Sequence, residues 1–156
     1  MTKLNLNLNN FLPYRLSILS NKISRELANL YEDRFQISNQ EWRIMAILGE
    51  ESDISAAEVA NRTAMDKVAV SRAVKKLLAT GKLERHFSNE DRRRSVLSLS
   101  QAGIFIYQQI IPLAQDYEQQ LIAQLSTDEQ QKLTSLLIKL DNGQSRLRID
   151  MTDELN

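Results

Sequence analysis

Three consecutive arginines in the segment NEDRRRSV, Asn89 to Val96, are the strongest candidates for chemistry in this sequence. They follow two acids, Glu90 and Asp91, in a chain whose formal net charge is zero. A guanidinium group binds phosphate through paired hydrogen bonds and enters the narrow minor groove of A·T-rich DNA, where the negative potential is enhanced. A run of like charges is also common on an ordinary solvated loop. The flanking segments decide between these two interpretations.

A second polar group lies on the predicted helix of the segment DKVAVSRAVKKLLATG, residues 66–81. Valines and leucines spaced three and four residues apart gather on one side of this helix. The opposite side carries Lys67, Ser71, Arg72, Lys75 and Lys76. A helix about 10 to 12 Å across fits the major groove of DNA. This side is therefore predicted to bind DNA, and the alternative is a solvated helix face.

The N-terminal part of a helix in the major groove reaches the base edges. The predicted base-contacting residues are Asp66, Lys67, Ala69, Ser71 and Arg72. Arg72 or Lys67 suits O6 and N7 of guanine, and Asp66 suits N4 of cytosine. Ala69 suits the methyl group of thymine. If the helix does not bind DNA, Asp66 serves only as a cap.

Two capping boxes predict the helices that position this face. Ser38 and Glu41 precede a short helix that is expected to stop at Gly49. Ser55 and Glu58 open a helix of barely two turns, AAEVANRT. About three residues connect it to the helix at 66–81, which has Asp66 at its N-cap or first turn and Gly81 as its C-cap. Two helices joined this tightly form a helix-turn-helix.

Beyond Gly81 the hydrophobic period changes from 3.6 to 2, which predicts a β-hairpin. Its strands are KLERHF and SVLSLS, and SNEDRR forms the turn. A basic hairpin directly after a helix-turn-helix indicates a winged helix. The arginine run is therefore interpreted as a DNA-contacting tip.

The three arginines at the tip are expected to have different roles because alternate residues of a strand point to opposite sides. If Arg93 enters the minor groove, Arg92 and Arg94 face phosphate or solvent. Asp91 would repel phosphate, so it is expected to accept hydrogen bonds from a neighbouring arginine or from N–H groups of the turn. His86, on a strand of the hairpin, is expected to be a strand residue or a phosphate contact.

Amphipathic helices are predicted at both ends of the chain. One covers residues 11–34, another begins after Ser100 and runs to about Gln124 with a kink at Pro112, and a third follows the capping box at 126–129 and ends before Gly143. A small winged domain cannot cover their apolar stripes, so a two-fold homodimer is expected to bury them. The alternative is an intramolecular bundle.

Composition excludes several other classes of protein. The 156 residues contain no cysteine and one histidine, so disulfides, thiolate metal sites and common hydrolase triads are not expected. We predict neither an enzyme nor a metal or cofactor site. Residues 61–100 carry ten basic and four acidic residues, net +6, against −6 for the rest, which indicates a basic face for a polyanion. Without a long apolar run or the apolar core of a signal peptide, the protein is expected in the cytoplasm, away from membranes.

The run VAVSRAVKKLLATGKLERHFSNEDRRRSVLSLSQAG resembles the recognition helix and wing of MarR-type transcriptional regulators, whose Asp-x-Arg motif stands here as Asp91-Arg92-Arg93. The resemblance extends over nearly the whole chain. It implies a mostly α fold with a small β-hairpin wing, organised as one domain of residues 1–156. Within this domain a winged helix-turn-helix at 38–100 lies between dimerisation helices at 11–34 and 101–141.

The same resemblance implies a homodimeric repressor that binds a pseudo-palindromic operator in double-stranded DNA. A small-molecule effector, often an aromatic acid or phenol, commonly releases such repressors. In the family the position of Arg93 inserts into the minor groove, and that of Asp91 orients basic side chains of the wing. Members that sense oxidants use cysteine, which this chain lacks.

The ligand-binding residues are predicted from position alone. Arg15 lies one helical turn from Phe11 and Leu19, so a guanidinium at the mouth of an apolar pocket is expected to bind a carboxylate. Trp42 is expected to line the same space, although a core position for Trp42 and an ion pair for Arg15 are alternatives. The rival function is a winged-helix protein-interaction module whose basic face binds an acidic partner.

Overall fold

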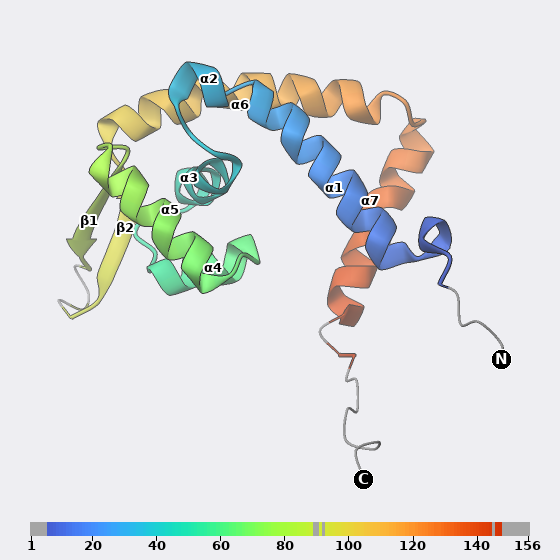
Figure 1. The fold of residues 1–156 in the computed structure, drawn as a ribbon, viewed down its shortest axis with the longest axis horizontal. Coiled ribbons are helices and arrows are strands. Elements are labelled where there is room, and N and C mark those ends of the chain that lie inside the picture. Colours follow the sequence, from blue (N-terminus) through green and yellow to red (C-terminus); the bar gives the residue numbers. More distant parts are fainter. Residues whose placement is uncertain (1–5, 89–90, 92, 145, 148–156) are drawn as a thin grey trace, which may run out of the picture. The chain divides into compact units, whose positions relative to one another are not determined.

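The computed structural model describes residues 6–88, 91, 93–144 and 146–147. The chain forms two compact units, Met1–Gln115 and Asp116–Asn156, and each is described by itself. The elements in chain order are η1 (Leu8–Asn10), α1 (Leu12–Asn29), α2 (Glu32–Phe35), α3 (Asn39–Glu50), α4 (Ala56–Thr63), α5 (Lys67–Ala79), β1 (Leu83–Phe87), β2 (Ser95–Leu99), α6 (Gln101–Ile122) and α7 (Thr127–Gln144) (Figure 1). This confirms a mostly helical fold with one small β-hairpin.

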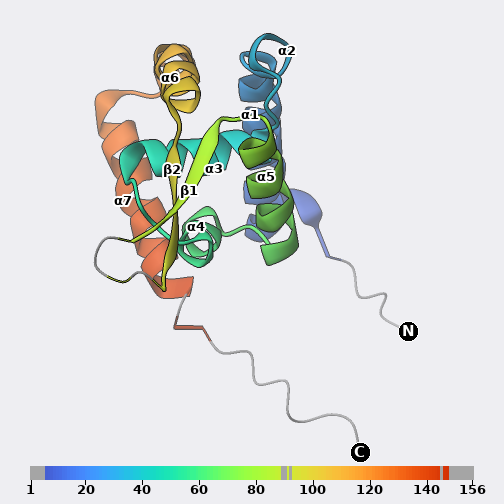
Figure 2. The ribbon, with the colours of Figure 1, turned by 90° about the vertical axis from the view of Figure 1, so that its left-hand side faces the viewer.

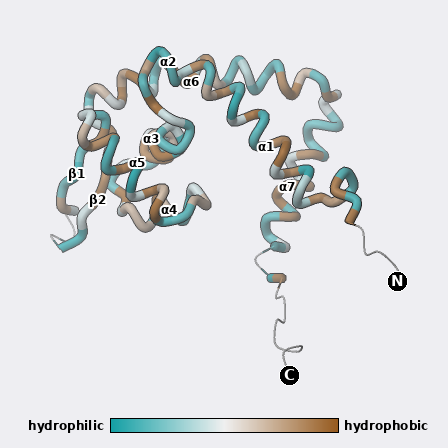
Figure 3. Tube along the Cα trace, in the orientation of Figure 1, coloured by the Kyte–Doolittle hydropathy of each residue, from teal (hydrophilic) through white to brown (hydrophobic). Residues whose placement is uncertain are grey.

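The core of the first unit lies among α3, α4, α5 and the hairpin. The largest fully buried side chains include Ile44 and Met45 of α3, Val59 of α4, Leu77 of α5 and Leu97 of β2. Hydrophobic residues are accordingly concentrated along α3 and β2 (Figure 3). This shared core fixes the recognition helix α5 against the other helices of the winged part.

The predicted N-terminal helix at 11–34 is wrong in one respect, because the structure divides it. The helix α1 ends at Asn29, and α2 begins at Glu32. Tyr31, between them, is buried with 1% of its surface exposed, and its hydroxyl donates to Oδ1 of Asn39 at 3.0 Å. The break turns Tyr31 into the core, and Gln36, at φ 55°, ends the second helix.

The capping boxes at Ser38 and Ser55 are both confirmed. Each serine hydroxyl accepts from the backbone N–H of the glutamate three residues later, which in turn accepts from the serine N–H. The helix α3 continues one residue past its predicted end at Gly49. A Cβ at position 49 would lie 2.3 Å from Cζ of Tyr107, so glycine allows α6 to approach α3 closely.

The hairpin pairs β1 and β2 in antiparallel register, with Leu83 opposite Leu99 and Phe87 opposite Ser95. Figure 2 shows the two strands side by side with α5 beside them. At the end of α5, Gly81 takes φ 70°, where a residue with a side chain would be strained. The N–H groups of Gly81 and Lys82 donate to the carbonyls of Leu78 and Leu77, which closes the helix and directs the chain into β1.

Ser100 caps α6 as predicted, since its hydroxyl accepts from the N–H of Gly103 at 3.0 Å. The helix passes through Pro112 and ends at Ile122, two residues before the predicted end. The capping box of Ser126 and Glu129 is also present. The predicted stop before Gly143 is wrong: α7 runs to Gln144, because a glycine in a helix costs only about 1 kcal/mol.

No helix within the described ranges combines the length and the hydropathy that crossing a membrane requires.

Candidate nucleic-acid interface

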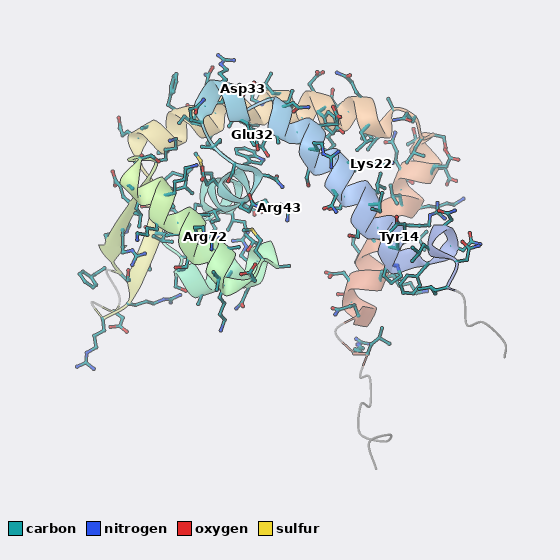
Figure 4. All side chains as sticks on the ribbon, viewed as in Figure 1. Tyr14, Lys22, Glu32, Asp33, Arg43 and Arg72 are labelled. Carbon is teal, nitrogen blue, oxygen red and sulfur yellow. The ribbon has the colours of Figure 1, made fainter. Side chains whose placement is uncertain are left out.

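The polar face of α5 is exposed as predicted. Val70, Ala73, Val74 and Leu77 are buried, whereas Lys67, Ser71, Arg72 and Lys75 are exposed. Arg72 is labelled on α5 in Figure 4. Asp66 is the N-cap, and its Oδ1 accepts from the backbone N–H of Ala69 at 2.9 Å. One carboxylate oxygen of Asp66 is thus already engaged in capping.

Two grooves flank the exposed face of α5. Lys67, Ser71 and Lys75 line a groove of about 700 Å³ against α4, with Arg85 of β1 on its rim. Ala69, Arg72 and Lys76 line a smaller one, of about 320 Å³, against the start of α3. The predicted contact residues therefore do not form one row, and Ala69 is half-buried on the flank toward α3.

Lys76, predicted as a DNA contact, forms an ion pair with a buried acid. Its Nζ lies 2.9 Å from Oε1 of Glu41, a residue with 3% of its surface exposed. The other oxygen of Glu41 accepts from the backbone N–H of Ser38 at 3.2 Å. A buried carboxylate is costly without a partner, so Lys76 holds α5 against α3.

Arg94, another predicted DNA contact, joins the wing to α4. Its guanidinium donates to Oε2 of Glu58, the same oxygen that accepts from the N–H and hydroxyl of Ser55. The hydrogen bond from the Ser55 backbone, then that from the Ser55 hydroxyl and then that from Arg94 lower the pKa of Glu58 to about 2. Glu58 is therefore ionised at neutral pH and serves the helix cap and the wing together.

Asp91 organises the turn of the wing through backbone contacts. Its Oδ1 accepts from the N–H of Arg93 at 2.9 Å, and its carbonyl accepts from the N–H of Arg94 at 2.9 Å. Arg93 is exposed, and Arg92 lies outside the described residues. The geometry corresponds to the second of the two alternatives for Asp91, acceptance from N–H groups of the turn.

His86 and Asp53 connect β1 to the loop between α3 and α4. Nε2 of His86 lies 2.7 Å from Oδ1 of Asp53, and Asp53 takes a left-handed backbone at φ 63°. The N–H of Asp53 donates to the carbonyl of Leu97 at 3.0 Å. His86 is thus held by a protein carboxylate at the base of the wing.

The basic residues of the winged part divide into paired and unpaired groups. Arg62 bridges Glu50 and Glu51 at 2.6 and 2.8 Å. Within the described ranges, no carboxylate lies within 4.0 Å of the following cations: Lys67, Arg72, Lys75, Lys82, Arg85 and Arg93. These six can pair with phosphate without giving up a protein partner, which favours a polyanion as the ligand of this face.

Two residues of this face were missed from the sequence. Val68 and Phe87 are exposed large hydrophobics, at 66% and 65%, in the middle of an otherwise polar surface. Interpretation of the sequence assigned apolar residues to the core by type. The signal that could have identified Val68 is its angular position on the helix, one residue after Lys67 and opposite the buried valines.

The two predicted ligand-binding residues lie in different surroundings. Arg15 lines an open cavity of about 520 Å³ with other residues of α1, among them Tyr14 and Lys22, which Figure 4 labels. Trp42 does not line that cavity; its ring packs 5.7 Å from that of Tyr31 and 5.9 Å from that of Tyr107, measured between centroids. The structure therefore does not bring Arg15 and Trp42 together in that cavity.

Comparisons with known proteins agree on one family. The model of the MarR family matches residues 35–94. A MarR/EmrR family transcriptional regulator from Acinetobacter sp. ADP1 superimposes with a TM-score of 0.84 at 30% identity, covering 91% of this chain and 100% of that one. A mutant MarR from E. coli, solved in complex with operator DNA, gives 0.72 at 26% identity, covering 87% and 99%.

The homoprotocatechuate degradative operon repressor of Escherichia coli is 25% identical over 104 residues, which are 67% of this chain and 70% of that repressor. The matched segments span 65 to 71% of the length of the curated regulators that this chain resembles.

Proposed function

This chain belongs to the MarR family of DNA-binding transcriptional regulators, and on that premise we propose that it is a homodimeric repressor, released from its operator by a small ligand. The family consists of transcriptional regulators, not enzymes. The observation that carries the proposal is the face of α5, where Lys67, Arg72 and Lys75 are exposed without a described acidic partner. This face fits the major groove of a DNA duplex.

The contacts with DNA divide between α5 and the wing. Lys67, Ser71 and Arg72 meet base edges or nearby phosphates in the major groove, and Lys75 meets phosphate. Arg93 enters the adjacent minor groove, and Arg92 stays a predicted phosphate contact. Asp66, Asp91, Lys76 and Arg94 act by holding these groups in place, in line with their protein hydrogen bonds and ion pairs.

Exposed apolar residues on the terminal helices support a homodimer. They include Leu12, Leu16 and Leu19 of α1, and Leu133, Leu136 and Leu137 of α7. No residue of α7 is buried within the described protomer. A second copy would cover these residues through a two-fold interface, and its winged part would read a second half-site about one DNA turn away.

The effector is proposed to be an aromatic carboxylate. The name of the E. coli relative identifies it as the repressor of a homoprotocatechuate degradative operon. In this chain, Arg15 offers a guanidinium beside the apolar side chains of Leu12, Leu16 and Leu19. Titrating aromatic acids against wild type and Arg15→Ala tests this assignment. Loss of binding in the variant is expected, and unchanged affinity would contradict it.

The DNA-binding proposal is tested by incubating the purified protein with sheared DNA from its source organism at physiological salt and sequencing what it retains. Arg93→Ala is carried through in parallel. Enrichment of a few fragments that share an inverted repeat, greatly reduced in the variant, is the expected result. Weak and uniform retention by both proteins would instead favour a protein-binding surface.

A further inference from the structure

Val68 is exposed on a face where every neighbouring side chain is polar. Among the described residues from 38 to 100, only Val68 and Phe87 are large hydrophobic side chains with such exposure. Isolated exposed hydrophobics are normal on protein surfaces, so exposure alone decides nothing. The position of Val68 in the recognition helix carries the argument.

Val68 is the second residue of α5, directly after Lys67 and the N-cap Asp66. Side chains of a helix tilt toward its N-terminus, so Val68 projects at the end that reaches base edges in a helix-turn-helix. Ser71 and Arg72, three and four residues further on, lie on the same face and are exposed. Val68 therefore occupies the leading position of the exposed ridge of α5.

Ala69, the other apolar residue at this end, is placed differently. It is half-buried and lines the groove toward α3, together with Arg72 and Lys76. Its backbone N–H is engaged by Asp66 at 2.9 Å. With a single methyl group set back on the flank of the helix, Ala69 is less able to reach a base than Val68.

We propose that Val68 is a specificity-determining residue that contacts the C5-methyl group of one thymine in each operator half-site. Thymine is the base that presents an apolar group in the major groove. Valine offers two methyl groups and no hydrogen-bonding atom, so cytosine, which presents an amino group there, would meet no acceptor. This inference rests on the proposed DNA-binding function and names one base contact within it.

Arg72 would supply the polar contact next to this apolar one. Four residues separate Val68 from Arg72, a rise of about 6 Å along the helix axis. That distance is comparable with one to two base-pair steps of about 3.4 Å each. The operator is therefore expected to carry, in each half-site, a thymine close to the guanine read by Arg72.

The test replaces thymines by deoxyuridine, one position at a time, in the operator recovered by DNA capture. This change removes only the C5-methyl group. Wild type is expected to lose about fourfold in affinity at one position per half-site, as for one methyl group withdrawn from an apolar contact. Val68→Ala should bind the thymine operator several-fold more weakly and show no further loss with deoxyuridine.

Two variants serve as controls. Ala69→Ser and Phe87→Ala should both keep the full deoxyuridine penalty, because neither changes the group proposed to contact the methyl. Circular dichroism and the oligomeric state of Val68→Ala should match wild type, since its side chain is exposed.

The proposal is overturned if wild type is insensitive to deoxyuridine at every position, or if Val68→Ala keeps the penalty. Both results leave specific operator binding, and hence the proposed function, intact. Failure of wild type to select any operator would overturn the proposed function itself, and the assignment of Val68 with it.

Discussion

The guanidinium of Arg94, in the wing, is hydrogen-bonded to the carboxylate of Glu58, which also closes the capping box of α4. The two residues are 36 positions apart in the sequence. The contact attaches the wing to the helix-turn-helix at the point where the hairpin turns. Together with the His86–Asp53 pair nearer the base, it restrains the hairpin relative to α4. The orientation of the wing is thus set before DNA arrives.

Arg94→Ala is expected to weaken operator binding without changing its salt dependence. A lost phosphate contact lowers the slope of log K against log salt by about 0.9, whereas a loosened wing lowers affinity at every salt concentration. Glu58→Gln sharpens the test: if Arg94 positions the wing, binding falls; if Arg94 binds phosphate, releasing it raises affinity. Lys75→Ala is the control that should lower the slope. Titrations at several salt concentrations measure all three.

Arg72→Ala and Arg93→Ala should weaken operator binding in different ways. Arg72 is expected to read a base in the major groove, so its loss costs about 1 to 3 kcal/mol and relaxes preference at one base pair. Loss of Arg93 should reduce affinity for A·T-rich flanks and leave that preference unchanged. Binding to a set of single-base operator variants separates the two. Equal losses across the whole set for both variants would contradict this division.

Lys76→Ala should destabilise the fold, because it leaves the carboxylate of Glu41 buried without its partner. Unpairing a fully buried ion pair costs about 3 to 5 kcal/mol, but Lys76 is more than half exposed, so about 1 to 2 kcal/mol is expected. Lys75→Ala, one residue earlier and exposed, is the matched control and should change stability by less than about 0.5 kcal/mol. Urea unfolding measures both. Equal stability of the two variants would show that water, not Lys76, compensates Glu41.

The contribution of Glu58 to stability should depend on pH. Its pKa is lowered from an ordinary value of 4.5 to about 2 in the folded protein. The stabilisation is therefore complete above about pH 4.5 and is lost as the pH falls toward 2, where the folded state also takes up the proton. The difference in unfolding free energy between wild type and Glu58→Gln should shrink over this range. A difference that stays constant from about pH 5 to about pH 2 would refute the prediction.

Gly49→Ala and Gly143→Ala should have opposite effects on stability. A Cβ at position 49 would lie 2.3 Å from the ring of Tyr107, so the substitution is expected to displace the ring and cost about 1 to 3 kcal/mol. At position 143 nothing lies within 4 Å, and alanine should stabilise α7 by up to about 1 kcal/mol. Thermal unfolding compares them. The fluorescence of Trp42, which packs on Tyr107, should change only in the first variant.

The sequence alone was sufficient for most of the elements and their boundaries. The boxes at Ser38, Ser55 and Ser126, the cap at Asp66 and the turn at Gly81 were all predicted. Each depends on hydrogen bonds between residues two to five apart, or on the conformation of a single residue, so local chemistry determines it. The hairpin followed from its period of two, and its register from the length of the strands.

The tertiary structure decided which charged and apolar groups are available. Lys76 and Arg94 read as free cations in the sequence, but Glu41 and Glu58, 35 and 36 residues away, hold them. An ion pair over such separations depends on how helices pack, which hydrophobic periodicity does not specify. The break at Tyr31 and the exposure of Val68 have the same cause. Local periodicity determined which residues are helical, and packing around the shared core determined which of them are left to meet DNA.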